Sequence, residues 1–280
     1  MPNNPTFLYG LPSAVALAIA CAVLSVMVVS RRWAFIGEGI SHSGFGGAGT
    51  AWVLALLFPA VFDQPWMPYL CVVCFSLLTA IAIGYLSYRQ RVNSDAAIGI
   101  FMVASLAWGF LGRQIYFAHR HAEPVGFDQF LFGEMGALSA QYAIATVMLS
   151  AAIVLIVAVL AKEILYYCFD PVMAEASGVP AGFVHYLLML LVALAIVLGV
   201  RVAGSVLVTA LLVLPGATAL LISERLRTVI AAAVTIAVIG AAGGVGLNLH
   251  WRFIPAGPAI VLVLFVEFVL SYVASVVARR

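Results

Sequence analysis

The chain has 280 residues, of which 65% are hydrophobic and only 9% charged, and its formal net charge is +2. Soluble domains carry about 25% charged residues, so this composition excludes a soluble globular protein and predicts a polytopic membrane protein. The small net charge gives no indication of a nucleic-acid partner. Neither end carries a polar stretch long enough for a soluble domain, so residues 1–280 are expected to form a single transmembrane domain.

The apolar segments predict the number of membrane crossings. A helix needs about 20 mostly apolar residues to span a bilayer. The chain therefore predicts an all-α bundle of about nine spans, with eight to ten as the allowed range. The predicted spans are 11–30, 33–58, 67–88, 95–114, 142–163, 183–200, 203–223, 228–247 and 257–278. The first of these and 203–223 carry the weakest signals, and Pro215 is expected to break or kink the latter helix.

The basic residues of the loops predict an orientation, because such residues accumulate on the cytoplasmic side of a membrane. With the N-terminus outside and the C-terminus inside, the outer loops hold only Arg113, Arg120, Arg201 and Arg252. The inner loops then hold Arg31, Arg32, Arg89, Arg91, Lys162, Arg225, Arg227, Arg279 and Arg280. This arrangement requires an odd number of spans, in agreement with nine.

Two loops are long enough to hold structure of their own. The outer loop, 115–141, carries His119 and His121, which as exposed histidines are more typical of solvated side chains than of metal ligands. The inner loop, 164–182, has the marks of a short helix.

Residues 170–178 of the inner loop predict a short helix, with residue types typical of a helix start and a helix end. Asp170 can cap the first amides, Pro171 suits the first helical position, and Glu175 is expected to favour the positive end of the helix dipole. Gly178 then ends the helix. Two interpretations stand: a connection between two spans, or a helix that docks a cytoplasmic partner.

The most informative segment is GEGISHSGFGGAG, residues 37–49, which places Glu38 and His42 four residues apart in an apolar span. Residues i and i+4 share one helix face. If the helix starts near Trp33, His42 lies about 14 Å along it, close to the middle of a hydrocarbon core about 30 Å thick. Ionisable residues at that depth indicate a functional site.

Carboxylate oxygen and neutral imidazole nitrogen are ligands for zinc and manganese. One helix supplies only two ligands, whereas two subunits meeting at this face would supply four. The glycines around the pair would let another backbone approach closely, or let the helix kink. A structural ion pair between helices is the alternative. Asn248 and His250, near the outer end of a span, are weaker candidates for a metal pathway, and His185 is interpreted as structural.

The chain lacks the motifs of common enzymes. Its single lysine, Lys162, follows no glycine loop, so the chain has no GxxxxGK[ST] phosphate-binding site and no ATPase site of its own. It also has no HExxH zinc-protease motif and no GxSxG nucleophile elbow.

Five segments, in order between about residues 31 and 265, together resemble the membrane permeases of zinc- and manganese-type ABC importers. The segments are RRWAFIGEGISHSGFGGAG, FDQFLFGEMGALS, CFDPVMAEASGVP, VAGSVLVTALLVLPGATALLIS and IPAGPAIVL. Each motif is weak by itself, and their shared order carries the resemblance.

The resemblance implies a type II ABC importer fold and a multi-pass location in the cell membrane. It implies a homodimer with the pathway at its interface, two cytoplasmic ATPase subunits, and an extracytoplasmic protein that delivers the metal. The helix within 164–182 then becomes the coupling helix for the ATPase. Glu38 and His42 match the family's pathway-facing acidic residue and histidine. Glutamate replaces the usual aspartate, which leaves metal preference open.

Three rival functions use the same residues. A proton-driven secondary metal transporter would need no ATPase. A membrane enzyme with a metal centre would need a second acidic motif deep in the membrane, and Glu267 stands alone within its span. A permease for metal chelates would need a wider path. The transported zinc or manganese ion is expected to be a substrate, with no permanently bound cofactor.

Overall fold

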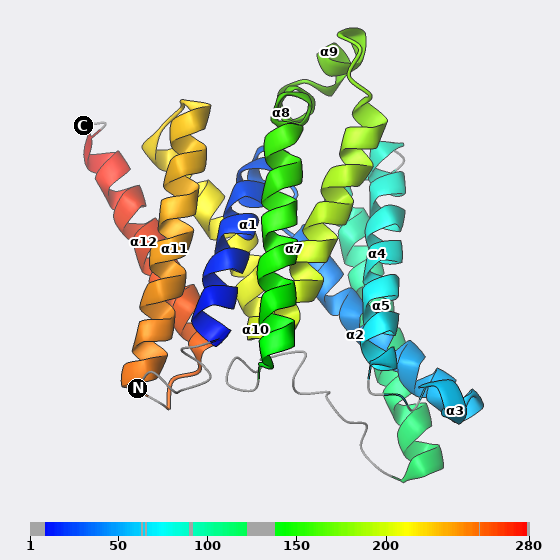
Figure 1. Cartoon of the computed structure of the whole chain (residues 1–280). Coiled ribbons are helices and arrows are strands. Elements are labelled where there is room, and N and C mark those ends of the chain that lie inside the picture. Colours follow the sequence, from blue (N-terminus) through cyan, green and yellow to red (C-terminus); the bar gives the residue numbers. More distant parts are fainter. Residues whose placement is uncertain are drawn as a thin grey trace.

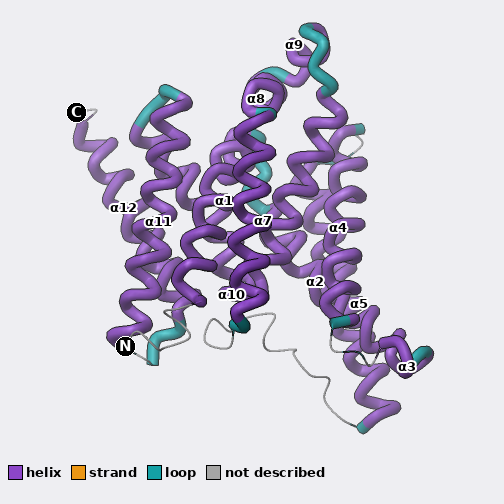
Figure 2. The backbone as a smooth tube through the Cα atoms, in the orientation of Figure 1, coloured by secondary structure: helices purple, strands orange, loops and turns teal. Residues whose placement is uncertain are grey.

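A computed structural model of the chain describes residues 9–62, 64, 66–89, 92–121, 138–251 and 253–278. Every regular element in these residues is a helix, as the sequence predicts (Figure 2). The long helices are α1 (Leu11–Ser30), α2 (Ile36–Leu57), α4 (Met67–Tyr88), α5 (Ser94–Arg120), α7 (Ala140–Val159), α10 (Ala181–Ile222), α11 (Leu226–His250) and α12 (Ala256–Ala278). The short helices are α3 (Pro59–Phe62), α8 (Ala161–Phe169) and α9 (Pro171–Ala176).

The described residues contain eight helical segments that are long and apolar enough to cross a membrane. Helix α2 has 22 residues, as long as several of these, but it is not among them. Its sequence includes Glu38, His42 and a set of glycines, which lower its apolar character. It nevertheless runs through the bundle against α4, α5 and α10 (Figure 1). Eight apolar segments, together with this polar helix, agree with the predicted range of spans.

Helix α10 contains the two predicted spans 183–200 and 203–223, and the break between them lies at Gly204. This residue has φ 84° and ψ 168°, a conformation outside the helical region that glycine adopts readily. Pro215 was expected to break or kink this helix, and a break there is excluded, because α10 continues through it to Ile222. Ser25 of α1 stabilises this stretch, since its Oγ accepts the amide hydrogen of Gly216 at 2.8 Å.

The outer loop is shorter than predicted. Helix α5 continues to Arg120, so His119 lies in its last turn and its Nδ1 contacts the Ile115 carbonyl oxygen at 2.9 Å. His121 ends the helix with φ 51°. The FDQFLFGEMGALS segment spans residues 127–139, and its residues 127–137 lie outside the described residues.

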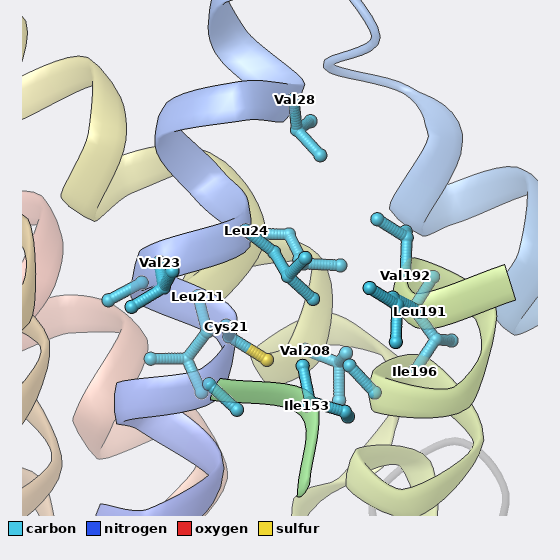
Figure 3. Close-up of a cluster of buried hydrophobic side chains, with 14 of the residues drawn as sticks. Cys21, Val23, Leu24, Val28, Ile153, Leu191, Val192, Ile196, Val208 and Leu211 are labelled. Atoms are coloured by element: carbon cyan, nitrogen blue, oxygen red, sulfur yellow. The ribbon is translucent and has the colours of Figure 1, made fainter. Parts of the chain in front are cut away.

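Helix α1 lies at the centre of the bundle. Two-thirds (67%) of its apolar window is buried, against 11% for α12 at the edge of the bundle. Figure 3 shows Cys21, Leu24 and Val28 of α1 among side chains of α7 and α10, including Ile153 and Val208. Helices α5, α7 and α12 expose apolar side chains that can contact lipid. In a hydrocarbon environment there is no hydrophobic driving force to bury such side chains.

The helix ends sort into two sets, as the charge pattern predicts. The end of α1, the α4–α5 connection, α8, α9, the α10–α11 connection and the C-terminus lie at one end of the bundle (Figure 1). The start of α1, α3, the end of α5 and the α11–α12 connection lie at the other. We refer to these as the inner and outer ends, following the orientation predicted from loop charge.

Candidate functional site

Glu38 and His42 contact each other near the start of α2. The Nε2 atom of His42 lies 2.6 Å from Oε1 of Glu38, the distance of a strong charge-assisted hydrogen bond. The i,i+4 spacing on a continuous helix brings them together, as the sequence predicts. The side chain of Glu38 is 39% exposed and that of His42 is 18% exposed, so the pair lies at the edge of the packed bundle rather than inside its core.

Thr209, which no sequence motif indicated, contacts the second oxygen of the Glu38 carboxylate. It lies in the second half of α10, and its Oγ is 3.3 Å from Oε2 of Glu38. Both carboxylate oxygens therefore have a partner, one from α2 and one from α10. The only feature of the sequence that could have indicated Thr209 is its polar hydroxyl within the apolar run VLVTALLVLP.

The glycines of α2 serve packing within this chain. A Cβ added at Gly49 would lie 2.8 Å from the Cα atom of Gly109 in α5, and one at Gly47 would lie 2.6 Å from the Cα atom of Val72 in α4. Neither position can hold a larger residue without moving a backbone. The prediction that these glycines let another backbone approach closely is confirmed within this chain: α2 is continuous, and α4 and α5 occupy the space beside these two glycines.

A single chain offers an incomplete metal site. No group of three or more histidine, cysteine, aspartate or glutamate side chains that could hold an ion occurs among the described residues. Glu38 and His42 supply one oxygen ligand and one nitrogen ligand. An ion that binds here must replace the hydrogen bond between them, and it needs further ligands beyond these two.

Asn248 and His250 lie apart from this pair. Both belong to the outer end of α11, which packs against α1, α10 and α12, whereas α2 packs against α4, α5 and α10. The amide of Asn248 donates to the Ile254 carbonyl oxygen at 2.7 Å, and His250 stacks edge-on against Trp251. These contacts hold the α11–α12 turn, so the structure gives Asn248 a local role and does not bring either residue to Glu38.

The inner loop forms α8 and α9, and most of its predicted features are present. Asp170 caps α9, since its Oδ1 accepts the amide hydrogens of Val172 and Met173 at 3.0 and 2.9 Å. Pro171 is the first residue of α9, and Gly178 follows its end with φ 85°. The reason given for Glu175 was wrong: it lies in the last turn, where its carboxylate accepts a hydrogen bond from the Tyr88 hydroxyl at 3.2 Å.

A buried hydrogen-bonded chain joins α8 to the transmembrane helices. The Nε2 atom of His185 lies 2.9 Å from the Gly84 carbonyl oxygen, which can only accept, so Nε2 carries the proton. Nδ1 then accepts from the Tyr167 hydroxyl at 2.6 Å, and that hydroxyl accepts from Arg31 at 3.2 Å. Burial also raises the pKa of Tyr167 to about 12. The structural role predicted for His185 fits these contacts.

Replacing Tyr167 with phenylalanine is expected to lower the free energy of unfolding by about 1–3 kcal/mol, because Nδ1 of His185 loses its buried donor. Denaturant titration of the purified protein in detergent measures this loss. Tyr166→Phe is the matched control, since Tyr166 is the neighbouring residue of α8 and is 54% exposed. Equal stability of the two variants would contradict a structural role for the buried chain.

Helices of this length and apolarity, arranged in one bundle, define a membrane protein that crosses the bilayer many times. The chain belongs to the ABC 3 transport family, whose model matches residues 5–275. It is 33% identical over 265 residues to the manganese transport system membrane protein MntC of Halalkalibacterium halodurans, covering 95% of this chain and 86% of the relative. It is 29% identical to a probable iron transport system membrane protein of Haemophilus influenzae, covering 96% and 93%.

A solved structure supports the same assignment. PsaBC from Streptococcus pneumoniae, determined in complex with a Fab, matches with a TM-score of 0.76 at 27% sequence identity. The match covers 95% of this chain and 91% of that one. The resemblance stated from the five sequence segments is therefore confirmed at the level of family and fold.

Proposed function

We propose that this chain is the permease subunit of an ABC importer for a divalent metal ion, manganese or zinc. The observation that carries the proposal is the Glu38–His42 contact, a carboxylate and an imidazole 2.6 Å apart in a membrane helix. Relatives named for manganese and iron transport support a divalent ion as substrate. Their names favour manganese over zinc.

The two-ligand pair favours a homodimer as the transporting unit. Two copies that face each other across a shared pathway would present two carboxylates and two imidazoles to one ion. Such a site replaces part of the hydration shell of the ion. It must also release the ion onward, so it has to bind more weakly than a closed structural zinc site.

Separate proteins are expected to supply energy and substrate. The chain has one lysine and no phosphate-binding loop, so ATP hydrolysis requires a cytoplasmic ATPase subunit. Helix α9 is the proposed contact for that subunit, because it projects from the inner end of the bundle and exposes Val172 and Met173 (Figure 1). An extracytoplasmic binding protein would deliver the ion at the outer end, and ATP-driven movement of α9 would alternate access between the two sides.

Asp170→Ala tests the role of α9. Loss of the cap is expected to cost about 0.5–2 kcal/mol of local helix stability and to lower ATP-driven uptake, because α9 no longer presents an ordered surface. Asp170→Asn keeps an oxygen acceptor and serves as the control. Uptake and ATPase co-purification are measured together, and alanine and asparagine variants with equal activity would contradict a coupling role for the capped helix.

The proposed function is tested by metal uptake into vesicles that hold this chain, its ATPase and its binding protein. Labelled manganese and zinc compete, with and without ATP, and the expected result is ATP-dependent uptake of one of them. Uptake that ignores ATP but follows a proton gradient would identify a secondary transporter instead. Uptake of neither ion under any condition would refute metal transport.

A further inference from the structure

The hydroxyl group of Thr209 has two acceptors and only one proton. Its Oγ lies 3.3 Å from Oε2 of Glu38 and 3.1 Å from the carbonyl oxygen of Ser205, one turn earlier in α10. A threonine hydroxyl commonly bonds to the i−4 carbonyl in a helix, so the second of these contacts is always available. Rotation about one bond therefore moves the proton from the carboxylate to the helix backbone.

The position of Thr209 relative to Glu38 is closely determined. A Cβ added at Gly37, the residue before Glu38, would lie 3.3 Å from the Cα atom of Thr209, so α2 and α10 are in tight contact at this level. Thr209 also follows the break at Gly204 by little more than one turn. The hydroxyl thus comes from the segment of α10 that begins at the break.

An entering cation changes which acceptor the hydroxyl uses. While Glu38 is free of metal, the hydroxyl donates to Oε2 and holds the carboxylate together with His42. Once a cation takes Oε2, a hydroxyl proton facing it is repelled, and rotation toward Ser205 turns an Oγ lone pair to the ion. Thr209 then presents an uncharged oxygen beside the carboxylate and imidazole.

The added oxygen favours one class of ion. Manganese prefers oxygen ligands and accepts a larger number of them, whereas zinc is satisfied by four ligands that include nitrogen or sulfur. We propose that the Thr209 hydroxyl adds an oxygen ligand beside Glu38 and thereby raises the preference of the pathway for manganese over zinc. This inference rests on the proposed function, because it requires Glu38 and His42 to bind the transported ion.

The test compares Mn²⁺ and Zn²⁺ affinities of the permease, in complex with its ATPase and embedded in lipid nanodiscs. Free Mn²⁺ is followed by its electron paramagnetic resonance signal, and Zn²⁺ is added as competitor. Thr209→Val keeps the branched shape and removes the hydroxyl. We expect it to lower the Mn²⁺-to-Zn²⁺ affinity ratio by about threefold to tenfold, the net effect of one ordinary hydrogen-bonding group.

Two further variants separate this role from a packing effect. Thr209→Ser retains the hydroxyl and is expected to keep the wild-type ratio. Thr218→Val removes a buried hydroxyl of the same helix that bonds to its own i−4 carbonyl, that of Leu214, at 2.7 Å, and it is expected to leave the ratio unchanged. Thr209→Ala replaces the valine variant if the latter does not fold.

The outcomes distinguish the inference from the proposed function. An unchanged ratio in Thr209→Val, or the same drop in Thr218→Val, would overturn the role of Thr209. If wild type and His42→Ala bind Mn²⁺ and Zn²⁺ equally well, the proposed metal site itself is wrong. Binding that is lost in His42→Ala and altered in ratio by Thr209→Val is the result that we expect.

Discussion

Replacing both Glu38 and His42 with alanine is expected to lower ATP-driven metal uptake by roughly 100-fold or more, since even residues that only support metal ligands change affinity by 10–100-fold. The double variant removes the carboxylate and imidazole whose contact defines the site. Uptake into vesicles by wild type and variant, at matched expression and with the same ATPase and binding protein, measures the effect.

A histidine variant controls for general damage. His119 lies in the last turn of α5, at the outer end, and is exposed, so His119→Ala is expected to leave uptake near the wild-type level. Equal uptake by the wild type and the Glu38/His42 double variant would refute the metal pathway. Glu38 and His42 would then be a structural pair that packs α2 within the bundle.

Gly204→Ala is expected to cost about 1–3 kcal/mol of stability, because φ 84° and ψ 168° belong to a region that residues with a Cβ almost never occupy. The strain is relieved only if the second half of α10 shifts. Such a shift moves Thr209 away from Glu38, so uptake is expected to fall several-fold along with stability. Denaturant titration and vesicle uptake on the same preparation measure both effects.

Gly246→Ala is the matched control for this variant. Gly246 lies within α11, and a Cβ added there would meet nothing within 4 Å. Alanine is the better helix former by about 0.5–1 kcal/mol, so this variant is expected to be as stable as wild type or slightly more stable. A Gly204→Ala protein as stable as wild type would show that the break in α10 does not depend on glycine.

These variants test how two helices are arranged. Helix α2 is continuous and carries Glu38 and His42, whereas α10 is divided at Gly204 and its second half contacts Glu38. We expect a change in α10 at Gly204 to reach Glu38 through Thr209, which contacts its carboxylate. At the inner end, the first half of α10 is bonded through His185 to Tyr167 of α8, which continues into α9. The proposed site for the ion and the proposed site for the ATPase are therefore both attached to α10.

Features that depend on neighbouring residues could be predicted from the sequence. The membrane class follows from apolar runs of about 20 residues, and the contact of Glu38 with His42 follows from i,i+4 spacing. The cap of α9 by Asp170 and the turn at Gly178 were predicted because capping involves only bonds to amides a few residues away. The five ordered segments were sufficient to indicate the family.

Features that depend on distant parts of the chain required the tertiary structure. Thr209 reaches Glu38 across 171 positions of sequence, and no local pattern distinguishes it from the threonines that bond only to their own helix. The break in α10 lies at Gly204 and not at Pro215, and beside Pro215 the hydroxyl of Ser25 in α1 accepts the Gly216 amide hydrogen, a contact between residues 191 positions apart. Local sequence determines which helices form and how they end, whereas packing between helices decides which of their side chains meet.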